Sequence, residues 1–100
     1  MTGADERIQL RNPDPTKRAP RMDRDTYAIV RKTALATLPA KEPGMTWTDF
    51  RDTVSARLLR TKGYDSKLNP WWYTHAVKLD LEARGEIKRV GNSPQRLVRG

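Results

Sequence analysis

Apolar residues recur at helical spacing in three stretches of the chain, separated by residues that favour turns and helix ends. An aspartate can cap the first stretch and Pro39 ends it. Thr46 or Thr48 can cap the second, and Thr46 with Asp49 resembles a capping box. The pattern therefore predicts three helices: Asp23 to Leu38, Trp47 to Arg60, and Pro70 to Arg84.

The third predicted helix has the clearest boundaries and the widest apolar arc. Asn69 is a good N-cap, Pro70 suits the first helical position, and Gly85 can adopt the left-handed conformation that ends a helix. At about 100° per residue, its apolar arc is roughly 200° wide. The arc holds Trp72, Tyr73, Ala76, Val77, Leu79, Leu81 and Ala83. A surface helix has a narrower stripe, so we expect neighbours on two sides and Trp72 in the core.

Polar residues occupy the remaining arc of this helix, which we expect to face outward. The arc holds Trp71, Thr74, His75, Lys78 and Glu82. Asp80 and Arg84 instead fall within the apolar arc. A buried carboxylate needs a partner, and a nearby arginine is expected to supply it.

The hydrophobic period changes from helical to extended after the third helix. Glu86 to Val90 and Arg96 to Arg99 are predicted strands, and Gly91 to Pro94 has the composition of a turn. Ile87 and Leu97 are the expected inward-facing pair. The C-terminal segment is thus predicted to be a β-hairpin.

Three helices followed by a hairpin predict a mainly α fold with a C-terminal β-hairpin (α+β). We interpret this order as a winged helix-turn-helix, three helices plus a wing, whose third helix presents one face outward. The domain is expected to span residues 23–100. Residues 1–22 form an N-terminal arm that is partly extended or mobile, with one short strand allowed by Ile8 and Leu10. As a functional alternative, basic residues of the arm touch phosphates: Arg11, Lys17, Arg18 and Arg21.

Composition and charge indicate a small domain with an anionic partner. The chain has 100 residues, which fits one domain, and its formal net charge is +8. A basic excess of this size favours an anionic partner, of which nucleic acid is the commonest. The excess is densest in the predicted hairpin, at Lys88, Arg89, Arg96 and Arg99.

Several kinds of chemistry lack the residues that they need. The chain has no cysteine and one histidine, whereas a metal site needs three or four ligands. No glycine-rich phosphate loop appears, and the acidic residues are scattered at helix-surface spacing. We therefore expect a non-enzymatic protein with no catalytic residue, metal or cofactor. No apolar run is long enough to span a membrane and the first residues do not form a signal peptide, so a cytoplasmic location is expected.

Several short motifs resemble a family of small bacterial proteins of unknown function. The most specific is the run WWYTHAVKLDLEARGEI, in which a tryptophan pair precedes Leu-Asp-Leu-Glu-Ala-Arg-Gly. The likeness covers nearly the whole chain and implies a winged-helix-like domain of unassigned biochemistry, with no catalytic residue. The motifs are Asn12-Pro13, Asp23 to Tyr27, Leu38-Pro39, Gly44 to Thr46, and Trp71 to Ile87.

The first functional hypothesis is binding to double-stranded DNA, as in a transcriptional regulator. Side chains on the outward arc of the third helix would reach base edges or phosphates in the major groove: Thr74, His75 and Lys78. Basic residues of the wing would contact phosphates beside it: Lys88, Arg89 and Arg96.

The alternative hypothesis is a protein–protein interaction module on the same scaffold. Trp71 on the third helix and Ile29 on the first would be interface residues, because aromatic and apolar side chains are enriched in interface cores. A monomer and a homodimer are both compatible with the sequence. Fold alone does not separate the two hypotheses.

Overall fold

The computed structural model describes residues 6–91 and 94–100. Within them the chain forms three helices and two small antiparallel sheets, so the fold is α+β with a C-terminal hairpin, as predicted. The elements in chain order are β1 (Arg7–Gln9), β2 (Arg21–Asp23), α1 (Arg24–Thr37), β3 (Met45–Thr46), α2 (Trp47–Leu59), α3 (Pro70–Ala83), β4 (Ile87–Val90) and β5 (Arg96–Arg99).

The three helices begin at the capping residues expected from the sequence. Asp23 accepts the backbone N–H of Thr26 at 3.0 Å, and Asn69 accepts that of Trp71 at the same distance. Thr46, rather than Thr48, caps α2, because its Oγ1 accepts the N–H of Asp49 at 3.2 Å. Each side chain satisfies a donor that the first turn of a helix leaves free.

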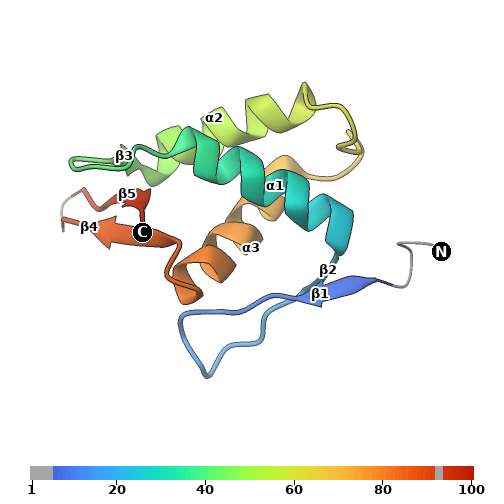
Figure 1. Cartoon of the computed structure of the whole chain (residues 1–100), viewed down its shortest axis with the longest axis horizontal. Coiled ribbons are helices and arrows are strands. Elements are labelled where there is room, and N and C mark those ends of the chain that lie inside the picture. The colour runs from blue at the N-terminus through green and yellow to red at the C-terminus, as the bar shows by residue number, and fades with distance from the viewer. Residues whose placement is uncertain (1–5, 92–93) are drawn as a thin grey trace.

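The hydrophobic core lies between the three helices. Its fully buried side chains come from all of them: Val30 of α1, Phe50, Val54 and Leu58 of α2, and Val77 and Leu81 of α3. Figure 1 shows α1 and α2 side by side, with α3 crossing behind α1. Ile87 and Leu97 are 2% exposed, which confirms the predicted inward-facing pair of the hairpin.

The C-terminal sheet contains one strand that the sequence did not predict. β4 and β5 form the expected hairpin, with Val90 opposite Arg96. β3 pairs with the other edge of β5, with Met45 opposite Leu97, so the strand order is β3-β5-β4. Of the predicted turn at residues 91–94, Asn92 and Ser93 lie outside the described residues.

The N-terminal arm is part of the fold from residue 6 onward. β1, the short strand that the sequence allowed, pairs with β2 so that Ile8 lies opposite Met22. Leu10 and Met22 are 2% and 3% exposed, and the N–H of Leu10 donates to the carbonyl of Pro20 at 3.0 Å. Residues 6–22 of the arm are thus partly extended and pack on the helices, because these two side chains join the core.

A buried carboxylate ties the arm to α1 and α3. Asp80 has no exposed surface, and Nε of Arg84 lies 3.0 and 2.9 Å from its two oxygens. The nearby arginine expected from the sequence is therefore Arg84. The Tyr27 hydroxyl donates to the same carboxylate at 2.5 Å, and the backbone N–H of Arg11 donates to it at 2.8 Å. Burial, reinforced by the hydrogen bond to Asp80, raises the pKa of Tyr27 to about 12.

Candidate nucleic-acid interface

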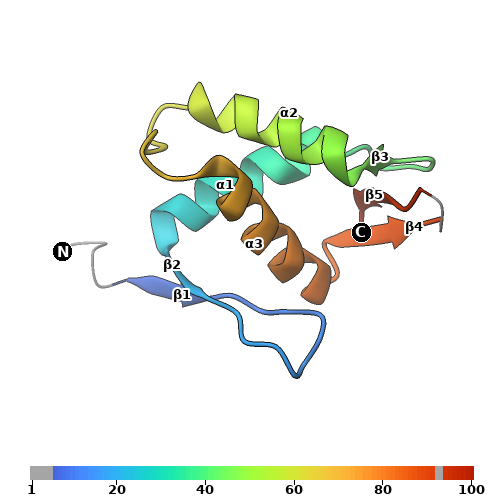
Figure 2. The same ribbon diagram turned by 180° about the vertical axis from the view of Figure 1, so that it is seen from behind.

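Helix α3 lines a cavity together with the N-terminal arm and the C-terminal hairpin. Figure 2 shows these two segments next to the C-terminal half of the helix. The helix packs against both α1 and α2, as its wide apolar arc predicted. What remains accessible is a strip of exposed or half-buried side chains: Trp71, Trp72, His75 and Leu79. Glu82 adjoins this strip, but its side chain is only 7% exposed.

Two of the predicted groove-reading residues are buried instead of outward-facing. Thr74 is 0% exposed and Lys78 is 8% exposed, whereas Trp72, which was expected in the core, is 47% exposed. The buried arc of α3 is therefore rotated by about 60° from the arc drawn on the helical wheel. The helical wheel placed polar residues on the outward arc. A lysine can nevertheless bury its long aliphatic stem when its amine finds a partner.

That partner of Lys78 is Glu82, one turn further along α3. The Lys78 Nζ lies 2.5 Å from the Glu82 Oε2, and 5.4 Å from the centre of the Trp47 ring on α2. The Lys78 amine is thus buried and paired within the protein, and it cannot reach a guanine or a phosphate from this position. The same ion pair lowers the repulsion between Glu82 and any anion on this face.

His75 is the predicted base-contacting residue that the structure does leave exposed. Its ring centre lies 5.5 Å from that of Trp47 in an edge-on arrangement. Partial burial, with the nearby charge of Lys78, lowers the pKa of His75 below its usual value, while Glu82 opposes the shift. A neutral imidazole carries one donor and one acceptor, which suits hydrogen bonding to a base edge.

The three predicted hairpin cations differ in their exposure and in the bonds that they make within the protein. Lys88 is exposed and forms no ion pair with a described residue. The Arg89 Nε is held by the Glu82 Oε1 at 2.7 Å, and its Nη1 reaches Gln95 at 3.4 Å. Arg96 is half-buried, and it donates to the Gly44 carbonyl at 3.4 Å.

The loop of the arm brings further cations to the opposite side of α3. Arg11, Lys17 and Arg18 are all exposed. Asp14 organises the loop, because it accepts from both the backbone N–H and the hydroxyl of Thr16. The sequence offered these cations only as an alternative; the signal for an ordered arm was the apolar pair of Leu10 and Met22.

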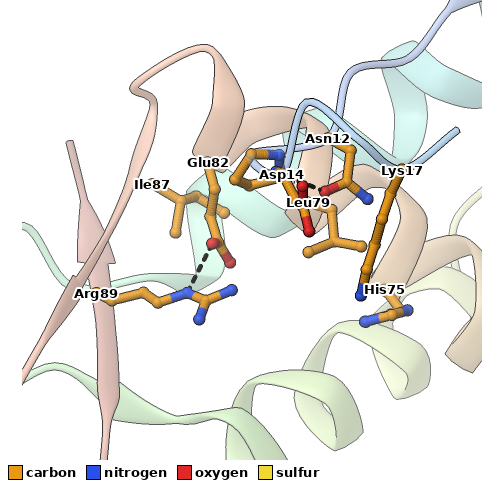
Figure 3. A pocket seen from close by; sticks show the side chains of 9 residues that line it. Asn12, Asp14, Lys17, His75, Leu79, Glu82, Ile87 and Arg89 are labelled. Carbon is orange, nitrogen blue, oxygen red and sulfur yellow. Dashed lines mark hydrogen bonds and ion pairs between the residues drawn. The ribbon is translucent and has the colours of Figure 1, made fainter. Parts of the chain in front are cut away.

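A cavity of about 810 Å³ separates the arm, α3 and the hairpin. Figure 3 shows Lys17 and His75 at one end of it, and Arg89 with its Glu82 partner at the other. Leu79 and Ile87 supply apolar surface between them. The cavity thus places Lys17 of the arm and Arg89 of the hairpin around one face of α3.

The two tryptophans at the start of α3 form an exposed aromatic surface. Trp71 is 52% exposed, and the Cζ of Arg51 lies 3.8 Å from the centre of its ring. Trp72 packs edge-on against Tyr73, with ring centres 4.9 Å apart. Ile29, the other predicted interface residue, is half-buried in a separate groove between α1 and α2, so the structure does not bring it together with Trp71.

The remaining chemistry of the described residues is limited. No three His, Cys, Asp or Glu side chains among residues 6–91 and 94–100 are grouped as metal ligands. Within the same residues, no helix combines the length and the hydrophobicity needed to cross a membrane.

The comparison with protein families identifies a shared domain. A family model described as a family of unknown function (DUF6958) matches residues 7–97. The chain belongs to this family. The DUF6958 match begins in β1 and ends in β5, so the arm and the hairpin belong to the region that the family model covers. No curated protein and no solved structure matches the chain.

Proposed function

We propose that this member of the family is a winged-helix domain that binds double-stranded DNA. The observation that carries the proposal is the position of the exposed face of α3 between two basic segments, the arm loop and the hairpin. Each segment offers cations at the surface: Arg11, Lys17 and Arg18 on one side, Lys88 and Arg89 on the other. Contacts of this kind to phosphates would fix the orientation of the helix on a duplex.

The order and pairing of the elements support the winged-helix part of the proposal. A short strand lies between the first two helices, and it joins the sheet formed by the two strands after the third helix. In such an arrangement the third helix would enter the major groove and the β4–β5 hairpin would lie beside it as the wing.

The base contacts of this proposal differ from those expected from the sequence. Thr74 and Lys78 are excluded because both are buried. His75 remains, since it is exposed near the middle of the accessible strip. Phosphate binding would supply most of the affinity, because the strip itself carries little free charge once Glu82 has paired with Lys78 and Arg89.

A pair of matched double variants tests the proposal. Lys17→Ala with Lys88→Ala removes one cation from the arm and one from the hairpin. Lys32→Ala with Lys62→Ala removes the same charge from the α1–α2 side, away from α3. Binding of a random-sequence duplex is measured by fluorescence anisotropy as the salt concentration is raised.

Lys17→Ala with Lys88→Ala should make the slope of log binding constant against log salt concentration shallower by up to about two units. Each lost phosphate contact removes about 0.9 from the magnitude of this slope. Lys32→Ala with Lys62→Ala should leave the slope close to that of the unchanged protein. Equal effects from the two variants would show that only total charge matters, and would contradict the proposed face.

A protein interface is the second candidate function, and one observation favours it. Trp71 and Trp72 are each about half exposed at the start of α3, and tryptophan is enriched among the residues that dominate protein interfaces. In this case Trp71 would insert into a pocket of the partner, and the cations of the arm and the hairpin would form the polar rim around it.

A further inference from the structure

A second groove lies between α1 and α2, with a volume of about 510 Å³. Its lining comes from these helices and the turn after α2, and it includes no described residue of α3, the arm or the hairpin. The groove is therefore separate from the proposed DNA-binding face.

The rim of this groove carries positive charge only. Its cations are Lys32, Arg57, Arg60 and Lys62, and all four are exposed. No acidic residue lines the groove, and none of the four forms an ion pair with another described residue. Like charges that line one groove favour an anionic partner, because a complementary charge relieves their mutual repulsion.

The floor of the groove is apolar. Ile29, which is half-buried, lines the groove beside the turn at Gly63, and the exposed Ala36 is the other apolar residue of the lining. The threonine hydroxyls in the lining are already used, because Thr33 donates to the carbonyl of Ile29 at 2.9 Å and Thr61 donates to that of Arg57 at 2.7 Å. An apolar floor with a charged rim is the anatomy of a small protein-docking site.

We propose that the α1–α2 groove docks an acidic peptide segment of a partner protein, with an apolar side chain of that segment seated on Ile29. A nucleic-acid backbone fits less well, because phosphate contacts need no apolar floor and would leave Ile29 unused. A second copy of this chain is disfavoured, because each copy carries a net charge of +8.

The test uses the full chain labelled with ¹⁵N and two synthetic peptides, followed by NMR amide shifts. The first peptide alternates glutamates with two leucines over about twelve residues, the length of a short groove-binding segment. The second keeps every glutamate and replaces both leucines with serine. The leucine peptide should shift amides around Ile29, Ala36 and Thr61, and it should bind more tightly than the serine peptide.

The two double variants of the DNA experiment are used again. Here the Lys32 and Lys62 variant is the test, and the Lys17 and Lys88 variant is the control. Lys32→Ala with Lys62→Ala should weaken binding of the leucine peptide by about threefold to tenfold, as expected for the loss of two rim charges. Lys17→Ala with Lys88→Ala, which removes the same charge elsewhere, should change it by less than about twofold.

Four results would overturn the proposal: no saturable shifts, equal affinity for the two peptides, equal weakening by the two double variants, or peptide shifts confined to α3 and the hairpin. If a DNA duplex, and not the leucine peptide, shifts the groove amides, the groove is a nucleic-acid contact and the proposal is also wrong. The proposed DNA function can fail independently, since it depends on Lys17 and Lys88.

Discussion

Asp80 links three segments of the described chain. Its carboxylate is fully buried, and it receives donors from three different segments: the Arg84 side chain, the Tyr27 hydroxyl and the Arg11 backbone. A buried charge is tolerated only when it is paired and hydrogen-bonded. One side chain thus holds α1, α3 and the N-terminal arm in register.

Replacing Tyr27 with phenylalanine should destabilise the protein by about 1 to 3 kcal/mol, because a buried carboxylate oxygen loses a donor. Urea unfolding at pH 7 measures the change. Tyr73→Phe is the matched control, since the Tyr73 hydroxyl makes no hydrogen bond to a described residue. Equal losses for the two variants would mean that the Asp80 contact contributes nothing.

Tyr27 also makes the free energy of unfolding depend on pH in the alkaline range. The pKa of Tyr27 is raised to about 12 in the fold, above the ordinary value near 10, so the unfolded chain loses the proton first. The contribution to stability is fully present below about pH 10 and is lost as the pH rises towards about 12. The Tyr27→Phe variant should lose less stability than the unchanged protein over this interval.

The sequence predicted an arginine partner for Asp80 but not the side of α3 that faces solvent. Arg84 follows Asp80 by one helical turn, so that pairing is local. Lys78 and Thr74 look like surface residues on a wheel, and Trp72 looks like a core residue. Their true positions depend on how α3 rotates against α1 and α2, and no local pattern contains that information.

Among the elements, the helices were the most predictable and the short strands the least. Helix ends follow from capping side chains, proline and glycine, all of which act within a few residues. β3 has only two residues, and its partner β5 lies far along the chain. The pairing of β1 with β2 likewise depends on distant contacts of Leu10 with the helical core.

The pairing of β3 with β5 predicts an intolerance to side chains at Gly44. This residue has a φ of +81°, and a Cβ there would lie 2.5 Å from the carbonyl oxygen of Leu97. Gly85 is a matched control, with a φ of +80° and nothing within 4 Å of its Cβ position.

Both alanine variants should lower the free energy of unfolding by about 1 to 3 kcal/mol, because alanine is strained in the left-handed backbone conformation. Gly44→Ala should lower it by about 1 to 3 kcal/mol more, because its Cβ overlaps with β5. Urea unfolding of the two proteins measures the difference. Similar stabilities would mean that β3 does not approach β5 this closely.

On the scale of the whole molecule, the net charge of +8 is distributed over distinct surfaces. The arm and the hairpin carry cations on either side of α3, and the α1–α2 groove carries a separate group. The total charge was evident from the sequence. Its division between two surfaces was not, because the folding of the arm onto α3 brings distant residues together.

The central claim is that the arm, α3 and the hairpin form one surface for duplex DNA. Its most direct test is the affinity of the unchanged protein for a random-sequence duplex, measured by fluorescence anisotropy over a range of salt concentrations. With roughly four phosphates contacted, the log of the binding constant should fall linearly with the log of the salt concentration, with a slope of about −3 to −4. The absence of binding at low salt, or a slope near zero, would contradict the claim.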